Sequence, residues 1–170
     1  QTPRMAQTLK IHLGLLLIGL VLPPAAWAHG EAHGTPKAAA PISSEQHPWG
    51  RQGDPNKATR TVRVTMSDTM RFDPSQLTIK RGETVTFVVH NAGKLMHEFV
   101  IGTPAALDAH AQMMKKHPGM EHDEPYMAHV APGKTQRISW TFNQAGEFLA
   151  GCLVAGHWTA GMKATLHVKE

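Results

Sequence analysis

The chain contains one cysteine, little net charge and a single short apolar run. Cys152 has no partner within the chain, which excludes an internal disulfide. The formal net charge is +4 over 170 residues, with acidic and basic residues evenly mixed. Such a charge is too small to favour nucleic acid or an anionic membrane surface as a partner. We find neither a catalytic nucleophile beside a base nor a phosphate-binding glycine loop, and we therefore expect that the protein is not an enzyme.

The apolar run lies near the start of the chain and has the features of an export signal. The positively charged residues Arg4 and Lys10 precede the apolar run over 11–22. A small-x-small sequence, typical of a cleavage site, ends at Ala28. We expect a signal peptide over 1–28, cleaved after Ala28, and a periplasmic mature protein. The run is too short to span a bilayer comfortably and no second one follows, so we expect no stable membrane insertion after processing. The alternative is an uncleaved membrane anchor.

Export makes the lone thiol informative, because paired cysteines normally form disulfides in an oxidising compartment. A single thiol there is buried and inert, paired with another molecule, or protected as a metal ligand. The chain also has twelve histidines and nine methionines. Imidazole and thioether groups suit soft and borderline metals, so the composition favours the third interpretation.

After the signal peptide, the sequence changes character once. Residues 29–58 are rich in Gly, Pro, Ala and His without a regular period, and we expect a flexible His-rich leader. From 59 to 170, apolar residues alternate with polar ones in short segments separated by turn residues. This pattern predicts one all-β domain, an antiparallel sandwich. Strands are expected near 61–66, 77–79, 85–89, 96–101, 136–142, 147–152 and 163–169.

One segment of the domain has a helical pattern. Thr103 is a suitable N-cap and the following proline suits a first turn. Leu107, Ala111 and Met114 then fall on one face, and Pro118 with the glycine after it ends the pattern. We expect a short helical insertion between strands.

Near the C-terminus, three metal-binding side chains follow one another at equal spacing. Cys152, His157 and Met162 are each five positions apart. A thiolate, an imidazole and a thioether are three of the four ligands of a blue-copper site, in which a second histidine completes a trigonal His₂Cys plane and methionine is the weak axial ligand. Each residue taken alone has an ordinary interpretation, since buried cysteine, methionine and histidine are common in cores.

The period of two indicates where these side chains point. Cys152 shares a strand face with Phe148, and Met162 shares one with Leu166. His97 is on the same face as Phe99 in the strand near 97. We therefore expect these three ligands to project into the sandwich from strand ends. His157 would close the site from the solvent side, with Trp158 helping to exclude water.

The order of the four residues resembles that of the cupredoxins, the type 1 blue-copper proteins. An upstream histidine within 95–99 is followed by Cys-x₄-His-x₄-Met, and the resemblance covers about 59–170. The more specific resemblance is to exported copper-tolerance cupredoxins of the CopI type, through segments 66–72 and 120–130 and the His-rich leader. It implies a Greek-key β-sandwich binding one type 1 copper, in the Cu(I) or Cu(II) state, through the four residues named above. Electron carriers of the family have Asn directly after the first histidine, where this chain has Glu98.

Other histidines and methionines are candidates for additional copper. The stretch 113–129 contains several soft donors: Met113, Met114, His117, Met120, His122, Met127 and His129. They would suit Cu(I), or else they pack the helix and line a loop. In the leader, His29, His33 and His47 are candidates for transient Cu(II) capture.

Two functions are consistent with the sequence. The protein is either a copper-handling factor for copper tolerance and homeostasis or a dedicated electron-transfer cupredoxin. Its expected partners are copper ions and a periplasmic redox or copper-transfer protein. Zinc fits the donor set less well because thioether is an unusual zinc ligand. In multicopper oxidases, histidines flank the copper-binding cysteine. In this chain, Cys152 is flanked by Gly151 and Leu153.

Overall fold

The computed structural model describes residues 41–118, 120 and 122–170. The expected signal peptide, together with His29 and His33 of the leader, lies outside this range. Within the described residues, no helix combines the length and apolar character that a membrane span requires.

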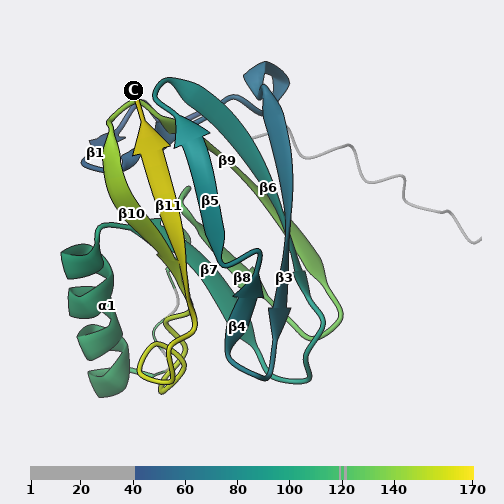
Figure 1. Cartoon of the computed structure of the whole chain (residues 1–170). Coiled ribbons are helices and arrows are strands. Elements are labelled where there is room, and N and C mark those ends of the chain that lie inside the picture. Colours follow the sequence, from purple (N-terminus) through teal and green to yellow (C-terminus); the bar gives the residue numbers. More distant parts are fainter. Residues whose placement is uncertain (1–40, 119, 121) are drawn as a thin grey trace, which may run out of the picture. The chain divides into compact units, whose positions relative to one another are not determined.

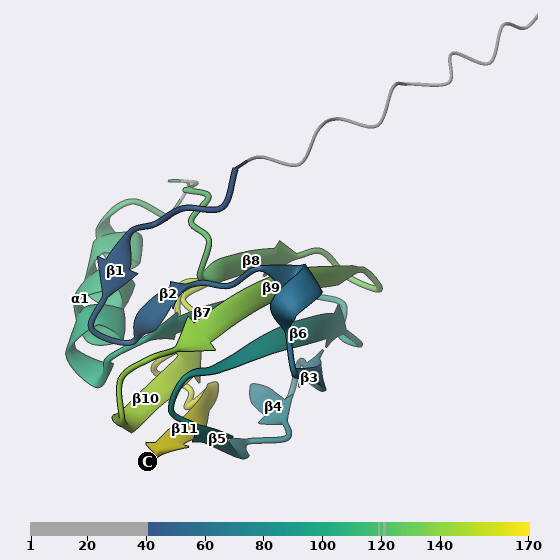
Figure 2. The ribbon, with the colours of Figure 1, turned by 90° about the horizontal axis from the view of Figure 1, so that it is seen from above.

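Eleven described strands form two sheets that face each other (Figures 1 and 2). In spatial order, the first sheet contains β1 (Gln46–His47), β2 (Gly50–Gln52), β9 (Thr135–Phe142), β6 (Glu83–Asn91), β3 (Arg60–Ser67) and β4 (Arg71–Asp73). The second contains β5 (Gln76–Lys80), β11 (Lys163–Lys169), β10 (Gly146–Gly151), β7 (His97–Gly102) and β8 (Met127–Val130). Neighbouring strands are antiparallel except for the parallel pairs β3–β6 and β5–β11.

The core lies between the two sheets and follows the predicted alternation. Phe87 and Trp140 from the first sheet and Phe99 and Leu166 from the second are fully or almost fully buried in one cluster. Each comes from a strand whose alternate residues point inward, as the period of two requires. The prediction of an all-β sandwich is confirmed, but the sheets are mixed and not purely antiparallel, because β3–β6 and β5–β11 pair in parallel.

Helix α1 (Pro104–Lys116) is the predicted insertion, and it covers the outer face of the second sheet beside β10 and β7 (Figure 1). The Thr103 side chain accepts a hydrogen bond from the Ala106 N–H, which caps the first turn. Leu107, Ala111 and Met114 are its buried residues, as predicted. They pack in a second cluster that the sheet separates from the main core.

The folded part of the chain begins earlier than expected. Strands β1 and β2 and a short 3-10 helix (Pro55–Lys57) lie within the range 29–58 that was expected to be a flexible leader. Strand β2 pairs with β9, and the Trp49 backbone carbonyl accepts a hydrogen bond from Trp140 Nε1 at 2.8 Å. The ring of His47, a candidate ligand in the leader, stacks on Trp49 with centroids 4.8 Å apart. Burial of Trp49 therefore holds this segment on the sandwich and corrects the expected boundary.

We predict that Trp49→Ala lowers the free energy of unfolding by about 3–5 kcal/mol, as is typical for truncation of a buried aromatic residue. Trp49 is 9% exposed and belongs to the main core. Ile42→Ala is the control, because Ile42 lies in the same segment but is 46% exposed and should change stability by less than about 0.5 kcal/mol. Chemical denaturation measures both. Equal, small effects would show that the segment does not stabilise the domain.

Candidate metal centre

Two parts of the chain that are distant in sequence, the start of β7 and the loop between β10 and β11, bring the predicted ligands to one end of the sandwich. His97 is the first residue of β7, Cys152 directly follows β10, and Met162 directly precedes β11. These three side chains are fully buried, as their strand faces predicted. His157 lies in the loop between β10 and β11 and is partly exposed. The structure thus places His157 on the solvent side of the other three.

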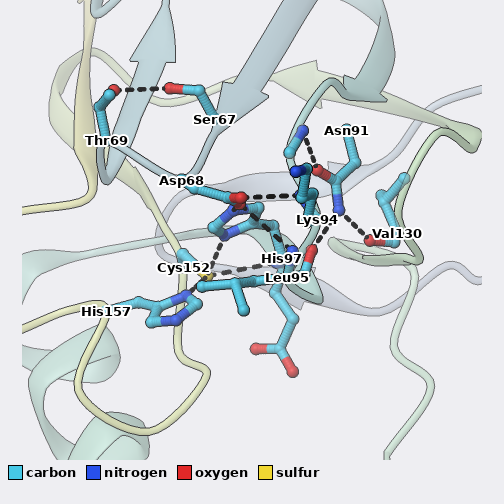
Figure 3. Close-up of polar contacts among 12 residues, drawn as sticks. Ser67, Asp68, Thr69, Asn91, Lys94, Leu95, His97, Val130, Cys152 and His157 are labelled. Carbon is cyan, nitrogen blue, oxygen red and sulfur yellow. Dashed lines mark hydrogen bonds and ion pairs between the residues drawn. The ribbon is translucent and has the colours of Figure 1, made fainter.

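The two imidazoles converge on the sulfur of Cys152 (Figure 3). The Cys152 Sγ lies 3.3 Å from His157 Nδ1 and 3.8 Å from His97 Nδ1. The three donor atoms, one from each residue, all lie within 4.8 Å of one another. In the described part of the chain, no other group of three or more His, Cys, Asp or Glu residues brings its donor atoms this close together. Both Nδ1 atoms therefore face the same small volume as the sulfur, as ligands of one ion must.

Backbone hydrogen bonds fix the loop that carries these residues. The Cys152 N–H donates to the Met162 carbonyl at 3.1 Å, which extends the β10–β11 ladder by one step. The Met162 N–H in turn donates to the His157 carbonyl at 3.1 Å. Met162 belongs to the same buried cluster as Cys152. The five-residue spacing thus corresponds to a closed loop in which three donors are tied to one another through the backbone.

The protonation properties of the site follow from its burial. Desolvation raises the pKa of the Cys152 thiol to about 12, although hydrogen bonds from the Glu98 and Val154 backbones act in the opposite direction. Desolvation also lowers the pKa of His157, and the neighbouring His97 adds to this shift. At neutral pH the unmetallated site therefore contains a thiol and a neutral His157 imidazole. A metal ion that binds the thiolate must displace the thiol proton.

Asp68 contacts the outer nitrogen of His97. Its Oδ1 atom lies 3.0 Å from His97 Nε2 (Figure 3). Hydrogen bonds lower the pKa of this carboxyl group, first that from the Lys94 N–H and then that from His97. Sequence reasoning did not identify Asp68, because its segment contributed only to a family resemblance. No local spacing indicates that residues 68 and 97 meet.

Glu98, which replaces the Asn of the better-known carriers, contacts the site through its backbone. Its N–H donates to Cys152 Sγ at 3.3 Å. Its side chain points to the other side of β7, where the carboxylate lies 3.1 Å from His129 Nδ1 and is only 7% exposed. The contact to the sulfur therefore does not depend on the side chain at this position.

Trp158 was expected to shield the site from water, but it lies on the other side of the second sheet. It packs in the outer cluster with Leu107 of α1, and its Nε1 donates to Asp108 at 2.7 Å. Cys152 and Met162 belong instead to the core between the sheets. The side chains of the adjacent residues His157 and Trp158 thus lie on opposite sides of the second sheet.

A second group of candidate ligands surrounds an open cavity of about 810 Å³ beside the site. Soft or imidazole donors among the described residues that line it are Met96, Met114, Met120, His122, Met127 and His129. Met113 and His117, from the expected stretch, are not among its lining residues. His110 of α1, which sequence reasoning missed, has its Nε2 atom 3.0 Å from Nε2 of His122. The helix and the loop after it therefore bring two imidazoles into direct contact.

Comparison with solved structures supports the fold. Auracyanin B matches with a TM-score of 0.58 and 23% identity, covering 71% of this chain and 96% of that one. Dithionite-reduced auracyanin from Roseiflexus castenholzii matches with a TM-score of 0.57 and 21% identity, covering 66% of this chain and 99% of its own. At these identities the likeness establishes the architecture, a cupredoxin sandwich.

Sequence comparison is more specific. The copper-resistant cuproprotein CopI of Rubrivivax gelatinosus is 50% identical over 140 residues, which cover 82% of this chain and 85% of that protein. The CopI protein of Pseudomonas aeruginosa is 32% identical and covers 91% of this chain and 94% of its own. The family model described as copper binding proteins, plastocyanin/azurin family, matches residues 58–169. The chain therefore belongs to the plastocyanin/azurin family of copper-binding proteins and, within it, to the CopI cuproproteins.

Proposed function

We propose that this protein is a redox-active periplasmic copper-handling factor that contributes to copper tolerance. In this proposal, one type 1 copper is bound by His97, Cys152, His157 and Met162. The observation that carries the proposal is the convergence of two imidazole Nδ1 atoms on the buried sulfur of Cys152, with a buried methionine tied to it through the backbone. This donor set is that of a trigonal His₂Cys copper site with a weak axial thioether.

The protein contributes a fixed arrangement of ligands. His97 and Cys152 are attached to paired strands β7 and β10, and Met162 is hydrogen-bonded to Cys152 and His157 through the backbone. The Glu98 N–H stabilises the thiolate once the proton has left the sulfur. Copper supplies one-electron exchange between its cuprous and cupric states. Ligands that stay in place in both states favour such exchange, which supports the redox part of the proposal.

The export signal expected over 1–28 supports a periplasmic location, where this copper chemistry would protect the cell. The two CopI relatives bear the name copper-resistant cuproprotein, which supports a role in tolerance. The proposed role is binding and transfer of copper or electrons, without transformation of an organic substrate.

The alternative function is that of a dedicated electron carrier between redox partners. The copper centre alone fits both functions. The cavity lined by methionines and histidines favours copper handling, because a carrier needs one copper only. His110 and His122 support this view: their Nε2 atoms are 3.0 Å apart, and burial lowers the pKa of His110, which keeps its imidazole available as a neutral ligand. We therefore include additional copper in the proposal, at the His110–His122 pair, of which His122 lines this cavity.

Replacement of the thiol tests the proposed function. We predict that Cys152→Ser abolishes the intense visible absorption of the cupric protein, because that band is thiolate-to-copper charge transfer. The same variant should fail to restore copper tolerance to a strain that lacks the gene. Absorption spectra of the purified variant and growth on copper measure the two effects. A variant that keeps the colour would contradict the proposed site.

The axial ligand can be tested with a matched pair of variants. We predict that Met162→Leu leaves copper bound and raises the reduction potential, because it removes a thioether that donates to the metal. Met66→Leu is the control, since Met66 is equally buried in the same core. Voltammetry should show an unchanged potential for the control. Equal potentials in both variants and the unmodified protein would exclude Met162 as a ligand.

Copper stoichiometry tests the additional site. We predict that the unmodified protein binds more than one equivalent, and that replacing His110 and His122 by Ala removes one equivalent without weakening the thiolate band. His90→Ala is the control, because His90 is exposed and belongs neither to the cavity lining nor to the His110–His122 pair. Metal analysis after equilibrium dialysis measures the difference. Saturation of the unmodified protein at one equivalent would favour the electron carrier.

A further inference from the structure

Asp68 occupies a tight turn that presents its carboxylate to the metal centre from the opposite sheet. The turn joins β3 to β4, and the Met70 N–H donates to the Ser67 carbonyl at 3.0 Å. The Ser67 and Thr69 hydroxyl groups also form a hydrogen bond of 2.7 Å (Figure 3). These contacts hold the residue between them in one orientation.

The carboxylate has three partners on the segment that leads into β7. Its Oδ2 atom accepts a hydrogen bond from the Lys94 N–H at 2.8 Å, and Oδ1 accepts one from the Leu95 N–H at 3.3 Å. The third partner is His97 Nε2, 3.0 Å from Oδ1. A Cβ atom at Gly93 would overlap Oδ1, so the close approach of this segment requires glycine there. Asp68 thus anchors the loop and the histidine together.

The loop is also held from its other side. The Asn91 side-chain amide donates to the carbonyls of Leu95 and Val130, each at 2.8 Å, and its oxygen accepts from the Gly93 N–H at 2.9 Å. Asn91 is fully buried. Because the backbone around His97 is fixed in this way, the imidazole meets the carboxylate in a defined position.

A carboxylate at this position has two chemical consequences for His97. An ionised carboxylate only accepts hydrogen bonds, so Nε2 must carry a proton, and Nδ1 presents its lone pair on the side of Cys152 Sγ. Outer carboxylate partners of this kind orient a ligating histidine and fix its tautomer. The negative charge also stabilises the more highly charged cupric ion relative to the cuprous ion.

We propose that Asp68 is a positioning residue for the copper centre, which fixes the tautomer of His97 and lowers the reduction potential. This inference rests on the copper site of the proposed function. It adds a residue outside the four ligands, from a strand pair that contributes none of them. The carboxylate supplies both a hydrogen bond and a charge, and these two contributions can be separated by substitution.

The tautomer is tested without metal, by ¹⁵N NMR of the histidine rings in the copper-free protein. We expect His97 to carry its proton on Nε2 in the unmodified protein, and to lose this preference in Asp68→Ala. A proton on Nδ1 in the unmodified protein would overturn the proposal, even if every variant failed to fold. Because no copper is present, this outcome is independent of whether the four ligands bind copper.

The charge is tested in the copper-loaded protein with Asp68→Asn, which keeps the size of the side chain. We expect the affinity for Cu(II) to fall about 10–100-fold, the range typical for loss of an outer partner of a metal ligand. The affinity for Cu(I) should fall less, and each tenfold difference between the two raises the potential by about 59 mV. Glu147→Gln is the control, because it removes one exposed carboxylate at the far end of β10 and should leave the potential unchanged.

A purely structural role gives a different result. If Asp68 only anchored the loop, Asp68→Ala and Asp68→Asn would both lower the melting temperature. The His97 tautomer and the reduction potential would then stay as in the unmodified protein. That combination would overturn the proposal. A raised potential in Asp68→Asn, together with an unchanged potential in Glu147→Gln, would support it.

Discussion

The site depends on a sulfur atom that is held away from water at the end of the sandwich. Burial keeps Cys152 protonated until a metal arrives, and the Glu98 N–H and two imidazoles then face the sulfur directly. The cost of desolvating a thiolate is recovered only when a cation and hydrogen bonds compensate its charge. The fold makes this compensation available by placing His97 and Glu98 at the start of β7 and His157 in the hydrogen-bonded loop between β10 and β11.

The second sheet separates two different chemical environments. On its inner side, the core and the candidate ligands meet, whereas its outer side is covered by α1 and Trp158. Glu98 links the two sides, because its backbone contacts the sulfur and its side chain contacts His129 at the cavity. The fold therefore sets a candidate copper centre and a methionine- and histidine-lined cavity on either side of one strand, β7. A single short strand can relate the two in this way because its successive side chains point in opposite directions.

The sequence was sufficient to predict what strand geometry determines locally. The inward direction of His97, Cys152 and Met162 follows from a period of two, and the helix follows from its cap and its apolar face. It was not sufficient for contacts between distant segments. Asp68 lies 29 positions from His97, and His110 lies 12 from His122, with no pattern that relates them. Strands β1 and β2 are too short for a period to be visible, and they are held by contacts to Trp140, 91 positions from Trp49.

The proposed type 1 copper site consists of two histidines, one cysteine and one methionine. Titration of the purified chain without its first 28 residues, with Cu(II), followed by visible absorption and EPR on the same samples, tests it most directly. We expect an intense thiolate band that saturates at one equivalent, with any further copper giving an ordinary cupric EPR signal. Cupric copper that binds without an intense band would rule out this site and leave Cys152 as a residue of the core.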